Sequence, residues 1–129
     1  MATAAGLAVL SQLNDKIYQE LEGYGKRIEA LIKRSAEDSG ISVIVNRSGS
    51  MFSTFFTNKP VRNFNDVFNC RNELYTKFFW SILEHGVYAP PSPYESCFIT
   101  ASHDKSDLKM LEDALYTSFR LISNERHTH

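Results

Sequence analysis

The 129-residue sequence has little of what marks several functional classes. It contains two cysteines, Cys70 and Cys97, and four histidines without the spacing of a zinc site. Two cysteines leave a disulfide open, but two free buried thiols in a reducing cytoplasm are the interpretation we favour. The formal net charge is −1, so no basic field exists to attract nucleic acid or an anionic membrane surface. We therefore expect no metal, nucleic acid or membrane partner.

Further features are missing along the chain. Its apolar runs are too short to span a bilayer, and its start lacks the basic residues of a secretory signal. Its glycines stand singly, so no loop is suited to hold a phosphate. No serine or cysteine lies in a nucleophile motif. The lysines lie among polar neighbours, whereas a Schiff-base lysine must be partly desolvated.

The sequence is rich in helical patterns. Residues 2–13 are rich in Ala and Leu and predict a helix, but no residue in front of it can cap its first amides. Asn14 or Asp15 can cap a second helix, which ends near Gly40. Gly23 and Gly25 weaken the middle of that helix by about 1 kcal/mol each relative to Ala. Residues 72–85 predict another helix, with Gly86 as its C-terminal stop. A last helix is expected after Asp104, and the charge of Asp107 suits its first turn.

The strand patterns are shorter. A β-branched run at 41–45 and a Phe-rich run at 51–57 predict a hairpin, with residues 47–50 as its turn. Two further short strands are predicted at 87–89 and 97–101. Residues 63–69 read as a loop with a helical turn. The sum is an α+β fold, a small mostly antiparallel sheet with helices on one face. We expect a single domain over residues 1–123 and a frayed polar tail over 124–129.

Aromatic residues are concentrated in the middle of the chain. A stacking surface for bases is one interpretation, but near-zero net charge and regular helix or strand spacing favour a hydrophobic core. The cluster comprises Phe52, Phe55, Phe56, Phe64, Phe68, Phe78, Phe79 and Trp80.

The most informative segment is residues 86–98, GVYAPPSPYESCF. Three prolines in four positions hold the backbone extended, and Glu95 follows directly before an apolar run. Such a loop can present one carboxylate at a fixed place, but a solvated loop glutamate is the more ordinary role. His103 precedes a helix start; a general base is conceivable, but a structural hydrogen bond is the favoured role.

Several motifs together resemble the glutamate-1-semialdehyde 2,1-aminomutase family of class III pyridoxal-phosphate aminotransferases. They are ATAAGLA at 2–8, GSMF followed by FFT at 49–57, PV-x-NF-x-D at 60–66, and the proline loop, where GVY-x-x-PS-x-YE is similar to the family pattern. His103 matches a histidine ahead of the last helix. The resemblance covers nearly the whole chain and is most specific in the loop.

The resemblance implies a fold and a role for the loop. The chain would be the C-terminal small domain of a fold-type I pyridoxal-phosphate enzyme, and residues 2–13 would join it to a large cofactor-binding domain. The family moves an amino group within its small-molecule substrate to give 5-aminolevulinate, a tetrapyrrole precursor. Glu95 would contact that substrate, with Ser92 and Tyr94 as loop supports.

The resemblance also sets limits. The family's catalytic lysine and cofactor-binding residues match no segment here, so the chain is expected to be an inactive fragment that binds no cofactor by itself. Its expected partners are the missing large domain and a second copy in a homodimer, in the cytoplasm or, with a transit segment, a plastid. A neighbouring aminotransferase activity, and a non-enzymatic α+β interaction module that has lost its chemistry, are the alternatives.

Overall fold

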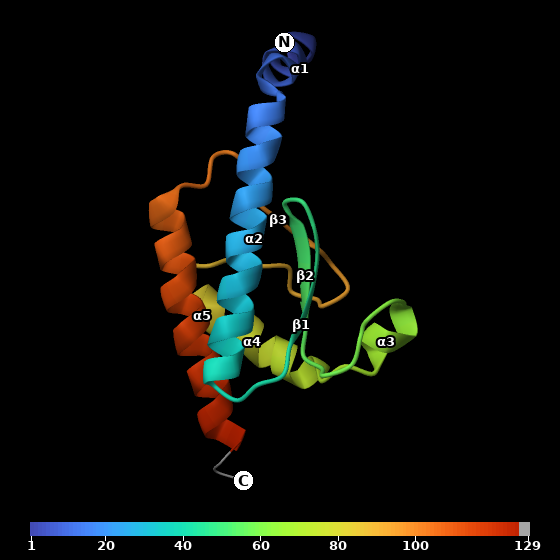
Figure 1. Cartoon of the computed structure of the whole chain (residues 1–129), viewed down its shortest axis with the longest axis vertical. Coiled ribbons are helices and arrows are strands. Elements are labelled where there is room, and N and C mark those ends of the chain that lie inside the picture. Colours follow the sequence, from blue (N-terminus) through green and yellow to red (C-terminus); the bar gives the residue numbers. More distant parts are fainter. Residues whose placement is uncertain (127–129) are drawn as a thin grey trace.

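A computed structural model describes residues 1–126 of the chain as five helices and three strands (Figure 1). The elements are α1 (Ala2–Gln12), α2 (Asp15–Asp38), β1 (Ile44–Ser48), β2 (Met51–Phe55), α3 (Phe64–Phe68), α4 (Asn72–Glu84), β3 (Cys97–Phe98) and α5 (Lys105–Arg126).

The helix ends follow from local sequence. The Asn14 side chain accepts a hydrogen bond from the Ile17 amide at 3.0 Å, which caps α2 as predicted. Gly40 and Gly86 have φ of +67° and +86°, a region that favours glycine. Behind Gly86, the Val87 amide donates to the Ile82 carbonyl and the Gly86 amide to that of Leu83, which closes α4 in a Schellman motif.

The sheet is antiparallel with strand order β1-β2-β3. β1 and β2 form the predicted hairpin, pairing Val45 with Thr54, and β3 adds only two residues, pairing Phe98 with Met51. The predicted strands at 41–45 and 97–101 are therefore shifted and shortened. The predicted strand at 87–89 is wrong, because the Val87 amide is used to cap α4.

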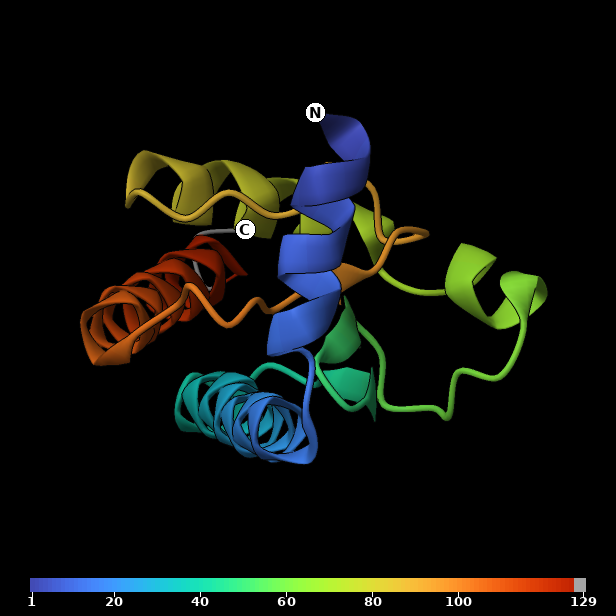
Figure 2. The same cartoon turned by 90° about the horizontal axis from the view of Figure 1, so that it is seen from above.

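The core lies between the sheet and three long helices. α2, α4 and α5 lie on the same side of the sheet, whereas α3 lies apart from them on the other side (Figure 2). Phe56, directly after the central strand β2, meets Phe78 of α4 and Phe119 of α5, and the centroids of the three rings are 5.2–5.9 Å apart. Phe119 is completely buried. This arrangement confirms the α+β prediction.

Three members of the aromatic cluster are not core residues. Phe64 and Phe68 are each 68% exposed and Trp80 is 57% exposed. Helical periodicity places Trp80 on the outer side of α4, although the neighbouring Phe79 is buried. The five-residue helix α3 is too short to bury both Phe64 and Phe68. Helical or strand spacing therefore predicted more burial than the packing provides.

The two ends of the described chain differ in packing. α1 contains no buried residue and has no side-chain cap. α5 continues through Arg126, so residues 124–126 belong to a helix rather than to the expected frayed tail, and 127–129 lie outside the described residues. No helix within residues 1–126 is long and apolar enough to cross a membrane, and no group of three or more His, Cys, Asp and Glu side chains in that range is arranged to hold a metal ion.

Candidate functional site

The proline loop runs from the end of α4 to β3 and is held at its start by Tyr75. The Tyr75 hydroxyl, on the buried side of α4, donates to the Pro90 carbonyl at 2.7 Å. Within the loop, the Tyr94 amide donates to the Ser92 hydroxyl at 3.2 Å and the Glu95 amide to the Ser92 carbonyl at 3.3 Å. These contacts form a compact turn immediately before the carboxylate.

The far end of the loop is attached to β2 and α3. The Ser53 hydroxyl donates to the Glu95 carbonyl at 3.4 Å and lies 3.2 Å from the Ser96 hydroxyl. The Tyr94 ring stacks on Phe64 with centroids 5.0 Å apart. Glu95 therefore lies between two attached points of the backbone. The structure gives Ser92 and Tyr94 a loop-holding position, and their substrate role stays a prediction.

Glu95 borders a cavity of about 240 Å³ beneath the loop. Most of the cavity wall is apolar, and the charged or titratable side chains in it include Glu95, His103 and Asp107. Glu95 is itself exposed. Within residues 1–126 the structure shows no hydrogen bond or ion pair to its carboxylate, which is thus available to a ligand.

His103 has a structural hydrogen bond. Its Nδ1 accepts from the Thr100 amide at 3.0 Å. Next to it, the Asp104 carboxylate accepts from the Ser106 hydroxyl and from the Ser106 and Asp107 amides. The bonds from Ser106 and Asp107 lower the pKa of Asp104. The geometry agrees with the structural role that the sequence favoured for His103.

Burial suppresses the acidity of two groups at the cavity. It raises the pKa of the Cys97 thiol to about 11. It also raises the pKa of the Tyr75 hydroxyl, and nearby Cys97 and Glu95 add to that increase. Cys70 lies outside this cavity, and its thiol pKa is raised by burial and by nearby Asp66. Both cysteines are free thiols, and the raised pKa of each disfavours the thiolate form at neutral pH.

The cavity beside Glu95 does not suit pyridoxal phosphate. Each of the seven lysines is exposed, and neither a lysine nor an arginine lines the cavity beside Glu95. A Schiff-base lysine needs a desolvated amine, and a phosphate group needs donors or positive charge. The residues of this cavity therefore do not fit the cofactor, and its binding residues would have to lie elsewhere.

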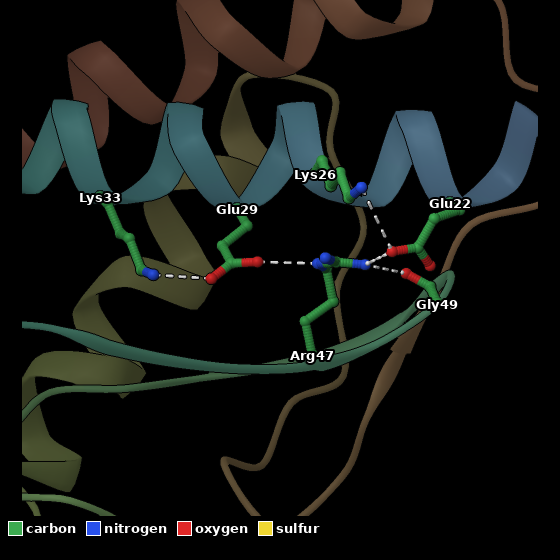
Figure 3. Close-up of polar contacts among 6 residues, drawn as sticks. All are labelled: Glu22, Lys26, Glu29, Lys33, Arg47 and Gly49. Carbon is green, nitrogen blue, oxygen red and sulfur yellow. Dashed lines mark hydrogen bonds and ion pairs between the residues drawn. The ribbon is translucent and has the colours of Figure 1, made fainter.

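A cluster of ion pairs holds the hairpin against α2. The sequence patterns did not indicate this cluster. Arg47 of β1 donates to Glu29 at 2.7 Å and to Glu22 at 3.1 Å (Figure 3). Its guanidinium also reaches the Gly49 carbonyl at 2.9 Å, and Lys33 pairs with Glu29 at 2.6 Å. The Arg47 side chain is only 14% exposed. Arg47 is 18 and 25 residues away from Glu29 and Glu22 in the sequence, so no local pattern could indicate these pairs.

Solved structures define the class of fold. A structure described as a transaminase with PLP bound aligns with 93% of this chain and 27% of its own, at a TM-score of 0.76 and 17% identity. An omega-transaminase from Sphaerobacter thermophilus aligns with the same share of this chain at a TM-score of 0.75 and 14% identity. The chain thus has the fold of one part of these transaminases.

Two sequence relatives are aminomutases. Glutamate-1-semialdehyde 2,1-aminomutases from Clostridium kluyveri and Thermus thermophilus are 38% and 40% identical over 117 residues, which cover 88% and 89% of this chain. No family model matches the sequence. The chain matches one segment of these glutamate-1-semialdehyde 2,1-aminomutases and spans about 28% of their length, as a C-terminal domain of such an enzyme would.

Proposed function

We propose that the chain acts as the C-terminal small domain of a glutamate-1-semialdehyde 2,1-aminomutase, which forms 5-aminolevulinate for tetrapyrrole synthesis. The observation that carries this proposal is 38–40% identity to such enzymes over most of the chain. A large domain would supply the lysine and the pyridoxal-phosphate site. The α1 helix, without a buried residue, would pack on that domain or on a second copy in a homodimer.

Glu95 is the group through which this domain would act. Its carboxylate is unpaired among the described residues, and the loop backbone on each side of it is held by Ser92 and Ser53. A carboxylate at a fixed place would attract an ammonium group of the substrate and hold the substrate in one orientation. The role of Glu95 is therefore binding and positioning, with the chemistry carried by groups outside this chain.

A chimera tests the role directly. This chain would replace the matching segment of the Thermus thermophilus enzyme, and formation of 5-aminolevulinate would be measured together with cofactor absorbance. We expect an active chimera in which Glu95→Gln lowers kcat/KM by about ten-fold, as the loss of a charged hydrogen bond does, without changing Tm. The control Glu84→Gln, on an exposed residue of α4, should leave both unchanged. A folded, cofactor-loaded but inactive chimera, or an active one indifferent to Glu95→Gln, would contradict the proposal.

The size of the native gene product separates this function from a stand-alone interaction module. An antibody against this domain would recover the product from its source cells for mass determination. A product about three times this chain is expected for a large domain joined to it. A product of this chain's own mass would assign it instead to a module that has kept the fold without the chemistry.

A further inference from the structure

We propose that the cavity bordered by Glu95 is a binding site for a small primary amine that carries an apolar group, such as a single aromatic ring on a short chain. This site belongs to the 129-residue chain itself. It needs neither the large domain nor the reaction, so it goes beyond the proposed function.

The size and walls of the cavity define the apolar part of the ligand. Its volume is about 240 Å³, whereas an apolar cavity of roughly 150 Å³ already holds benzene. Side chains from three helices contribute to the wall, among them Ile32 of α2, Ile82 of α4 and Leu115 of α5, each no more than 2% exposed. By volume, this cavity has room for a ring with two or three further carbon atoms.

The charges at the cavity define the polar part. Glu95 and Asp107 both line it, and neither a lysine nor an arginine does. One Asp107 oxygen accepts the Asp104 amide at 2.8 Å, which leaves its other oxygen available, and the Glu95 carboxylate has no hydrogen bond or ion pair within residues 1–126. Two carboxylates without a lysine or an arginine beside them favour an ammonium group and oppose a carboxylate ligand of the same shape.

Three matched ligands test the charge preference on the purified chain at pH 7.5. They are 2-phenylethylamine, which is protonated at this pH, the neutral 2-phenylethanol, and the anionic 3-phenylpropanoate. We expect the amine to bind about five-fold tighter than the alcohol, which corresponds to one solvent-accessible ion pair, and the anion to bind weakest. Equal affinity for the three, or no binding of the amine at millimolar concentration, would overturn the proposal.

The two thiols report where the amine binds. Cys97 lines the cavity and Cys70 does not. Bound amine should therefore slow methyl methanethiosulfonate labelling of Cys97, followed by mass spectrometry, and leave the labelling rate of Cys70 unchanged. Equal slowing at both thiols, or none at Cys97, would place any binding elsewhere and refute the proposed site.

Variants test the contribution of the cavity wall and that of the charge separately. Ala89→Leu, at a half-buried position of the cavity wall, should abolish the protection of Cys97; Leu111→Phe serves the same purpose if the first variant does not fold. Glu95→Gln should remove most of the preference for amine over alcohol, and Glu37→Gln, exposed on α2 and away from this cavity, should not. Unchanged binding in a folded wall variant would contradict the proposal. These measurements do not depend on catalysis. A negative result would therefore refute the amine site without bearing on the proposed function, which the chimera tests.

Discussion

Gly25 of α2 lies against the carbonyl oxygen of Gly49 in the β1–β2 turn. A Cβ atom on Gly25 would overlap with that oxygen and would lie 3.3 Å from the Arg47 side chain. Gly23, two residues earlier, has no neighbour within 4 Å of such an atom. The same residue type therefore has opposite effects at the two positions: Gly25 permits the hairpin to approach α2, and Gly23 only weakens the helix.

Alanine at the two glycines should move stability in opposite directions. Gly25→Ala is expected to lower the free energy of unfolding by about 1–3 kcal/mol, because the hairpin must move away from α2. Gly23→Ala should raise it by up to about 1 kcal/mol through helix propensity alone. Urea unfolding followed by circular dichroism measures both. A stabilising Gly25→Ala would show that the close approach is not required.

The Tyr75 hydroxyl should hold the start of the proline loop. Tyr75→Phe removes its 2.7 Å hydrogen bond to Pro90, at an expected cost of about 0.5–1.5 kcal/mol, and should speed amide exchange of Tyr94 and Glu95. Tyr88 is 76% exposed and has no hydroxyl partner among the described residues, so Tyr88→Phe is the control. Equal effects of the two substitutions would argue against a role for the hydroxyl.

Glu29 should contribute to acid sensitivity. Hydrogen bonds from Lys33 and Arg47 lower its pKa in the folded state, so its stabilising contribution is present above the ordinary value of 4.5 and is lost as the pH falls through the lower, folded-state pKa. Glu29→Gln should therefore be less stable than the native chain at pH 7, with a difference that shrinks as the pH falls below 4.5. Unfolding by urea between pH 3 and 7 measures this. A difference constant over that range would refute the linkage, and Glu37→Gln provides the matched control.

The Cys97 thiol should react slowly at neutral pH. Because its pKa is about 11 rather than 9.0, its thiolate fraction at pH 8 falls roughly 100-fold. Iodoacetamide should alkylate it much more slowly in the folded chain than in urea, and the folded-state rate should rise with pH until near 11. A folded-state rate that levels off near pH 9 would contradict the raised pKa.

Helix α1 should exchange its amides rapidly in a monomeric sample. It has 11 residues and none is buried, whereas isolated helices shorter than about 12–15 residues are marginal in water. Hydrogen exchange at several concentrations, combined with light scattering, tests this. Slow exchange throughout residues 2–12 in a strictly monomeric sample would refute the prediction, whereas protection that rises with concentration would show self-association through α1.

Local features of the chain were predictable because they depend on neighbouring residues. The Asn14 cap, the stops at Gly40 and Gly86 and the hairpin turn each rest on the backbone preferences of a few residues. The resemblance likewise singled out the loop around Glu95, and the sequence relatives confirm that resemblance. The role of Glu95 in substrate binding remains a prediction.

Other features required the tertiary structure because the residues involved are far apart along the chain. The pattern at 87–89 favoured a strand, but the Val87 amide bonds to α4. The spacing of Phe64 and Trp80 favoured the core, but no layer covers these side chains. The Arg47 pairs and the cavity beside Glu95 bring together segments from across the chain. The amino-acid sequence by itself determined the helices, their ends and the resemblance to these aminomutases. Only tertiary packing decided which side chains are buried and which charges meet, since these depend on long-range contacts that no local pattern encodes.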